Sequence, residues 1–157
     1  MKNPPNITAA RIIGPLALEI DWNTGETLRA DLTTLAKPPY DALRDTAFFD
    51  RMVRDDWGHG LDWPGGLDLG ADMLYELSRK QAGLPTASDF DQWMQRNGLS
   101  LAKAAETLGM TRRMIAHYRT GSRPIPKVVG LACKGWEAQL PPHTSPIVAD
   151  MRYQALL

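Results

Sequence analysis

Alternating apolar and polar positions dominate the first third of the chain and predict β-strands. A short β-rich run covers residues 7–13 and ends at Gly14–Pro15. Over residues 16–21 every second position is apolar, which is the period of a half-buried strand. The turn at Asn23–Thr24–Gly25 allows residues 26–31 to return as a partner strand. The sequence therefore predicts a β-hairpin here.

Less regular signals follow. Pro38–Pro39 interrupts the strand pattern, and residues 40–52 are predicted to be partly helical. We expect a second hairpin within residues 53–63, a turn at Trp63–Gly66, and a helix beginning near Gly70. Asp68 is expected to cap the local backbone or this helix. The side chains expected to face inward are those of Leu43, Phe48, Phe49, Met52, Trp63, Met73, Leu74 and Leu77.

Beyond Gly83, Pro85 and Ser88 the pattern changes to a helical period, which places a domain boundary near residues 82–88. A first helix presents Phe90, Trp93 and Met94 on one face. Three more are expected: Ser100 to Gly109, Thr111 to Gly121, and 127–140, the last with an apolar stripe of Val128, Leu131, Ala132 and Trp136. A short helix over 147–156 is expected in the tail.

These patterns together predict an α+β protein. Residues 1–85 form a small mixed domain of hairpins and helices, and residues 86–157 form an all-helical domain with a C-terminal tail. Cys133, the single cysteine, excludes an internal disulfide and is expected to be a small buried residue. No apolar stretch is long enough for a membrane-spanning helix and the N-terminus lacks a secretory signal, so we expect a cytoplasmic protein.

Charge is distributed unevenly along the chain although the formal net charge is zero. Residues 1–87 contain nine Lys and Arg against 13 Asp and Glu, whereas residues 88–140 contain eight against four. The basic half is therefore suited to meet phosphates, which the acidic half would repel.

The stretch SLAKAAETLGMTRRMIAHYRTG, residues 100–121, has the spacing required by two short helices that cross steeply. Ala105 lies where the helices approach most closely, and Gly109 lies in the turn, where a left-handed backbone favours glycine. Ile115 and Tyr118 point back from the second helix onto the first. The facing apolar side is supplied by Leu101, Ala104 and Leu108.

This stretch resembles the helix-turn-helix of the lambda repressor and Cro family, and residues 88–140 resemble that family's helical domain. The resemblance implies binding to double-stranded DNA, with the N-terminal part of the second helix in the major groove. One departure is Leu101, because many members have a glutamine there that contacts a phosphate and a base-reading side chain. Affinity would then depend on Ser100 and Lys103.

The resemblance also implies individual roles. Thr111 would approach a phosphate, Arg112 and Arg113 would bind guanine, and Ala116 and His117 lie on the exposed side of the same helix. Arg119, Arg123 and Lys127 would contact the DNA backbone. The alternative for the paired arginines is an ordinary solvated helix face, and for His117 a surface histidine. Family members usually pair on DNA, so we expect a homodimer formed through the N-terminal domain or the tail.

Residues 7–80 resemble a family of small bacterial domains of uncharacterised function, found alone or fused to a helix-turn-helix. The resemblance rests on LALEIDWNTGETLRADLTTL and VRDDWGHGLDWPGGLDLGADMLYEL, in particular on Trp63, Pro64, Gly66 and Asp68. Some members lie beside toxin-like proteins. The alternative function is therefore an antitoxin-like or other protein-interaction module that acts through the N-terminal domain.

Catalytic or metal chemistry is not expected. Asp55, Asp56, His59 and Asp62 are the alternative candidates, but they lie at a predicted hairpin tip with no second histidine or cysteine nearby. No nucleophile with its base, and no pair of carboxylates in a cleft, is recognisable in the sequence. We therefore expect a binding protein without enzyme activity, cofactor or metal.

Overall fold

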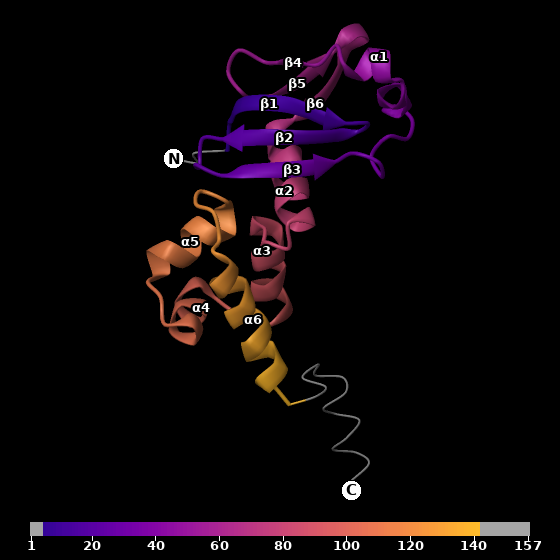
Figure 1. Ribbon diagram of the computed structural model, residues 1–157. Coiled ribbons are helices and arrows are strands. Elements are labelled where there is room, and N and C mark those ends of the chain that lie inside the picture. Colours follow the sequence, from indigo (N-terminus) through magenta and orange to yellow (C-terminus); the bar gives the residue numbers. More distant parts are fainter. Residues whose placement is uncertain (1–4, 142–157) are drawn as a thin grey trace, which may run out of the picture.

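The computed structural model describes residues 5–141, and in it the predicted α+β fold class is confirmed. Two small antiparallel sheets with short helices come first, followed by a helical region (Figure 1). The predicted tail helix over 147–156 lies outside the described residues, as does the tail contact proposed for a dimer. Within residues 5–141, no helix is both long enough and apolar enough to cross a bilayer.

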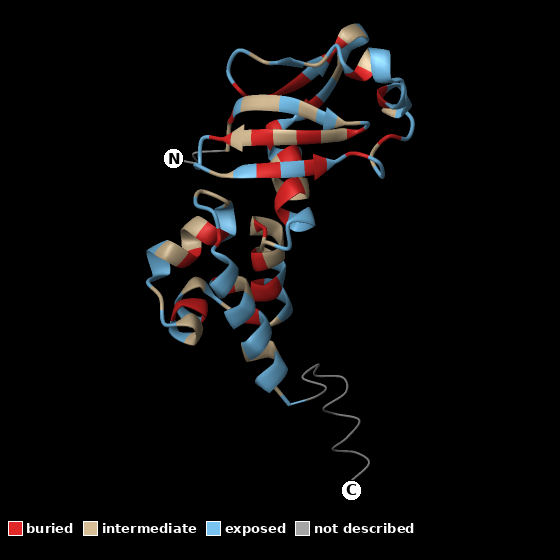
Figure 2. Ribbon diagram, in the orientation of Figure 1, coloured by how far each residue is buried: buried red, intermediate tan, exposed pale blue. Residues whose placement is uncertain are grey.

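The first sheet has the order β1 (Ile7–Gly14), β2 (Ala17–Trp22) and β3 (Thr27–Asp31). The predicted hairpin is the antiparallel pair β2–β3, with its turn at Gly25, where φ is +89°. Leu18, Ile20 and Trp22 are buried while the residues between them are half-buried, an alternation visible along β2 in Figure 2. The period-two pattern thus identifies the face that covers the core.

The second sheet comprises β4 (Val53–Arg54), β5 (Gly60–Trp63) and β6 (Leu67–Gly70). The predicted second hairpin is confirmed and gains β6 as a third strand. Trp63 is buried as expected, and its indole Nε1 donates to the Phe49 carbonyl at 2.9 Å. The expected capping role of Asp68 is wrong, because Asp68 pairs opposite Asp62 within the sheet and Gly70 is the N-cap of the next helix.

Short helices and α2 close the first core. The segments η1 (Asp41–Arg44), α1 (Thr46–Phe49) and η2 (Pro64–Gly66) lie in the connections, and α2 (Ala71–Gln81) packs against β3 and β6. Leu43, Phe49 and Leu74 are fully buried in this core. Met73 was expected beside Leu74 on the inner face but is exposed, since the sheets cover only the side of α2 on which Leu74 lies.

The helical region consists of α3 (Ala87–Arg96), α4 (Leu101–Leu108), α5 (Arg112–Thr120) and α6 (Lys127–Gln139). Phe90, Trp93 and Met94 are buried as predicted, and they form a second core with residues of the other three helices. Thr86 and Asp89 start α3 with a reciprocal capping box. The two cores are distinct clusters, while the domain boundary at residue 85 stays a prediction.

The predicted stripe on α6 is wrong at Val128, Leu131 and Ala132, which are exposed, and is confirmed only at Trp136. Val128 and Leu131 are 68% and 57% exposed, whereas Val129 and Cys133 are buried and Trp136 packs against them. Both sets recur at helical spacing, so the sequence of α6 offers two overlapping apolar stripes. Packing against α3 selects one of them, because Val129 and Cys133 join Phe90 and Trp93 in the second core. Gly130 of the same helix lies close to the segment before α3, where a Cβ would be 3.0 Å from the Pro85 ring.

A buried arginine links the two regions. The Arg79 side chain, at the C-terminal end of α2, is 4% exposed and donates to the Glu26 carboxylate on the β2–β3 hairpin. It also donates to the carbonyls of Pro85, at 3.0 Å, and of Ile125, which precedes α6. One guanidinium therefore holds the first sheet, the connecting segment and the loop after α5 together.

Candidate nucleic-acid interface

Side-chain caps and glycines define the two helices that contain most of the candidate residues. The Ser100 hydroxyl accepts from the Lys103 N–H at 3.1 Å and starts α4, and the Thr111 hydroxyl accepts from the Met114 N–H at 3.2 Å and starts α5. Gly109 ends α4 in the left-handed conformation, with φ of +67°. The predicted helix limits around this turn are therefore confirmed.

Small residues allow α4 and α5 to pack closely. Ala104 and Ala105 are buried on α4, and Ile115 and Tyr118 are buried on α5. Tyr118 also meets Phe90 of α3 edge to face, with ring centroids 5.8 Å apart. Because α5 is fixed on its inner side by both α3 and α4, its opposite side is presented outward as a rigid surface.

Arg112 and Arg113 occupy the first turn of α5, and both side chains are exposed, as is Thr111. Neither arginine forms an ion pair or hydrogen bond with any residue in 5–141. Arginine offers five N–H donors in a planar fork that suits phosphate and base edges. These two side chains are therefore available to an outside partner.

The remaining predicted residues on α4 and α5 differ in exposure. Ser100 and Lys103 are exposed, and the Lys103 ammonium lies 3.5 Å from the Glu106 carboxylate. Ala116 is half-buried. His117 departs from its expected outward position, since it is half-buried and its Nε2 is buried without a hydrogen-bond partner among residues 5–141. It flanks the inward face one position before the buried Tyr118, which explains the difference.

The three cations expected at the DNA backbone do not behave alike. The Arg119 Nε lies 2.8 Å from the Asp91 carboxylate on α3, so this guanidinium is already engaged within the chain. Arg123 and Lys127 are exposed and form no ion pair within the described range 5–141. The sequence contains no signal for the Asp91 contact, because the two residues are joined only by the packing of α3 on α5.

The four carboxylates of residues 88–140 are all paired, which leaves an excess of cations without an ion-pair partner in the described part of the chain. Besides the Asp91 and Glu106 pairs, Asp89 lies 3.9 Å from the Lys80 ammonium and Glu137 lies 2.7 Å from Arg96. Between residues 88 and 140, the cations that form no ion pair within the described chain are Arg112, Arg113, Arg123, Lys127 and Lys134. Lys134 had not been singled out from the sequence.

Comparison with known proteins identifies relatives of both regions. The solved structure of "Putative DNA Binding Protein NE0471" from Nitrosomonas europaea is 36% identical in sequence, with a TM-score of 0.71, over 92% of this chain and 96% of that chain. The chain belongs to the family of this protein. Residues 7–80 match the family model described as "Protein of unknown function (DUF2442)", which confirms the resemblance expected for the N-terminal region. No curated protein matches the sequence significantly.

Asp55 and Asp56, predicted at the second hairpin, lie on the loop between β4 and β5, and Asp55 stabilises this loop. The Asp55 carboxylate accepts from the backbone N–H groups of Trp57, at 2.6 Å, and His59, at 3.2 Å. These bonds, led by the one from His59, hold the pKa of Asp55 below its usual value. Within residues 5–141, no group of three or more His, Cys, Asp or Glu side chains is arranged to bind a metal ion.

Proposed function

We propose that the protein is a sequence-specific DNA-binding transcriptional regulator in which α4 and α5 form a helix-turn-helix of the lambda repressor and Cro type. The observation that supports this most directly is the exposure of Arg112 and Arg113 at the start of α5, where neither has an ion-pair partner among residues 5–141. In such proteins this part of the second helix enters the major groove, where a bidentate arginine–guanine contact discriminates between bases.

Electrostatics support the same proposal. Five cations of residues 88–140 have no carboxylate partner within the described chain, so this region attracts phosphates despite the zero formal net charge of the whole protein. Ser100, Lys103 and Thr111 would add phosphate contacts at the two helix N-termini. The 36% identical Nitrosomonas europaea protein, whose printed name describes DNA binding, is consistent with this function.

We further propose that the protein acts by binding rather than as an enzyme, and that it binds as a homodimer. A single module of this kind has a small interface, whereas two copies place two recognition helices in successive turns of the major groove.

The decisive test is selection of bound sequences from random duplex DNA, with wild type, Arg112→Ala, Arg113→Ala and the control Arg29→Ala. Arg29 is equally long and charged, 77% exposed, and lies on the first sheet. Wild type and control should enrich the same motif, while each α5 variant loses about 1–3 kcal/mol of discrimination at one base position. A wild type that enriches no motif would refute the proposal.

Salt dependence gives a second prediction. Because cations of the protein displace counterions from the phosphates, the logarithm of the dissociation constant should rise linearly with the logarithm of salt concentration. Lys127→Ala should reduce this slope by about one unit without changing the selected motif. Fluorescence anisotropy on the selected duplex measures both. An unchanged slope would remove Lys127 from the interface.

A second candidate function, a protein-interaction module, is favoured by Trp57. Its side chain is 77% exposed on the β4–β5 loop, and the Asp55 contacts fix that loop. Tryptophans presented in this way are frequent anchors of protein interfaces. A photo-crosslinking amino acid at position 57 should give a discrete adduct in expressing cells, and the same substitution at Arg29 should not. Absence of an adduct would remove this candidate.

A further inference from the structure

Helix α6 has a second apolar side that no element of residues 5–141 covers. Exposed residues run along the length of this helix (Figure 2). Val128 and Leu131 are 68% and 57% exposed, although both are large and apolar. Their side of the helix continues with small exposed residues at intervals of three or four positions, so that the outer stripe, as we call it, consists of Val128, Leu131, Ala132, Gly135 and Ala138.

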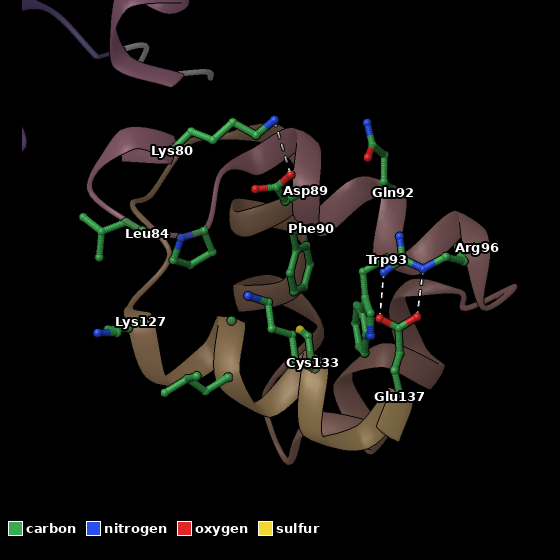
Figure 3. A pocket seen from close by; sticks show the side chains of 15 residues that line it. Lys80, Leu84, Asp89, Phe90, Gln92, Trp93, Arg96, Lys127, Cys133 and Glu137 are labelled. Carbon is green, nitrogen blue, oxygen red and sulfur yellow. Dashed lines mark hydrogen bonds and ion pairs between the residues drawn. The ribbon is translucent and has the colours of Figure 1, made fainter. Parts of the chain in front are cut away.

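The inner side of α6 is already occupied by α3. Cys133 joins Phe90 and Trp93 in the second core, and the Glu137 carboxylate accepts hydrogen bonds from two nitrogens of Arg96, drawn as dashed lines in Figure 3. A surface helix normally has one apolar side, whereas a helix that is apolar on more than one side is covered on each of them. The outer stripe therefore indicates that a further element packs against α6.

Residues 142–157 lie outside the described residues, and their sequence contains a matching segment. They follow α6 almost directly, since this helix ends at Gln139. Within the helix expected over 147–156, the apolar residues Ile147, Val148, Met151 and Ala155 recur at helical spacing. A helix this short is marginal in water on its own and gains most of its stability by packing an apolar side against the protein.

Length and charge fit a segment that turns back along α6. At about 1.5 Å per residue, a helix over 147–156 is about 15 Å long, as is the outer stripe from Val128 to Ala138. Residues 140–146 can bridge up to about 23 Å, which exceeds the roughly 8–10 Å between the axes of packed helices. An antiparallel return places Asp150, the only acidic residue of 142–157, level with Lys134, which has no carboxylate partner within residues 5–141.

We propose that residues 147–156 form a helix that packs antiparallel on the outer stripe of α6 in the same chain. Ile147, Met151 and Ala155 contact the stripe, and the Asp150 carboxylate approaches the Lys134 ammonium. This contact involves neither DNA nor the arginines of α5, and it forms within one chain whether or not the protein dimerises. Failure of this proposal is therefore distinguishable from failure of the proposed DNA-binding function.

Paramagnetic broadening in nuclear magnetic resonance spectra of the full chain, without DNA, tests the proposal. A nitroxide is attached to the cysteine of Gln154→Cys. The native Cys133 can stay in place, because burial raises the pKa of its thiol to about 11 and keeps it from reacting at neutral pH. Docking brings the label beside Leu131, so the amide signals of Val128 and Leu131 should lose most of their intensity. An undocked segment would broaden mainly the C-terminal end of α6.

Matched variants identify the surface and the occupant. Leu131→Asp places a charge in the outer stripe and should restore most of the Val128 signal, whereas Val53→Asp, at an apolar residue 63% exposed on β4, should leave the broadening unchanged. When nitroxide-labelled chains are mixed with isotope-labelled chains that carry no nitroxide, the Val128 signal should keep its intensity. A Val128 signal at full intensity in the labelled chain, or broadening that Leu131→Asp does not relieve, would overturn the proposal. Equal broadening in the mixture would overturn it too, because the segment of a second copy would then be the occupant.

Discussion

The two regions of the molecule use their charged residues differently. On the first sheet, Arg11 donates to Glu19 and to Asp21 on the neighbouring strand, and the bond from Arg11 holds the pKa of Asp21 at about 2. On α5, Arg112 and Arg113 have no partner among residues 5–141. Cross-strand pairing neutralises charge within the sheet. Residues 88–140 instead pair all their carboxylates and leave five cations without an ion-pair partner in the described chain, which concentrates the positive charge on the helical region.

The two regions also differ in the size of the side chains at the contacts between their secondary-structure elements. The first is filled by large side chains on strands, such as Leu18, Ile20 and Trp63, which lie on sheets held by backbone pairing. In the second, Ala104 and Ala105 lie at the contact between α4 and α5. Helix positions with no room for a larger side chain should therefore be more sensitive to enlargement than surface positions on the same helix.

The largest loss of unfolding free energy is expected from substitution of Arg79. This charged residue is buried and joins the two regions, so it belongs to neither pattern of charge use alone. Arg79→Ala leaves the Glu26 carboxylate, 22% exposed, and two carbonyls without their donor. Losing one partner of such a pair costs about 3–5 kcal/mol of unfolding free energy. Urea unfolding measures the change. Arg29→Ala, which removes an arginine 77% exposed, should cost at most about 1 kcal/mol. Similar losses for both variants would contradict a linking role for Arg79.

A smaller effect is expected from the contact between α4 and α5. Ala105→Leu inserts a larger side chain where only 7% of the residue is exposed, and such overpacking costs about 1–3 kcal/mol. Ala102→Leu on the exposed side of the same helix is the matched control and should be nearly neutral. Thermal unfolding of both variants makes the comparison. Equal stability of Ala105→Leu and wild type would mean that this contact tolerates a wider separation.

How far the sequence alone predicts this fold depends on whether a signal is local. Caps and glycines act on their own backbone, so Ser100, Gly109 and Thr111 give the limits of α4 and α5 correctly. The alternation along β2 likewise identifies the buried face. In contrast, α6 has two possible apolar stripes, and the choice between them depends on packing against Phe90 and Trp93 of α3, which are distant in sequence.

The candidate site shows the same limit. Exposure of Arg112 and Arg113 follows from their helical phase relative to Ile115 and Tyr118. The engagement of Arg119 by Asp91 and the burial of the His117 Nε2 arise from packing between helices, for which the sequence has no periodic signal. Arg79 is the clearest case, because a charged residue at the end of a helix is ordinarily predicted to be exposed.

The smallest effect is expected where charge stabilises the helical region itself, between Arg96 on α3 and Glu137 on α6. Hydrogen bonds from Arg96, with a smaller contribution from Asn97, lower the pKa of Glu137. A carboxyl group whose pKa is lowered on folding stabilises the protein above its unfolded pKa, and this stabilisation is lost as the pH falls through the folded pKa. The Arg96 side chain is 55% exposed, so solvent limits the contribution to about 0.2–1 kcal/mol.

Glu137→Gln should therefore be slightly less stable than wild type at neutral pH, with the difference shrinking as the solution is acidified. Unfolding free energies from urea titrations across the acidic range measure this. Glu106→Gln is the control, because Glu106 is 75% exposed and its partner Lys103 lies on the same helix. Its difference from wild type should stay close to zero throughout. A Glu137→Gln difference independent of pH would mean that packing alone joins α3 and α6. The Arg96–Glu137 ion pair would then contribute nothing to the stability of the helical region.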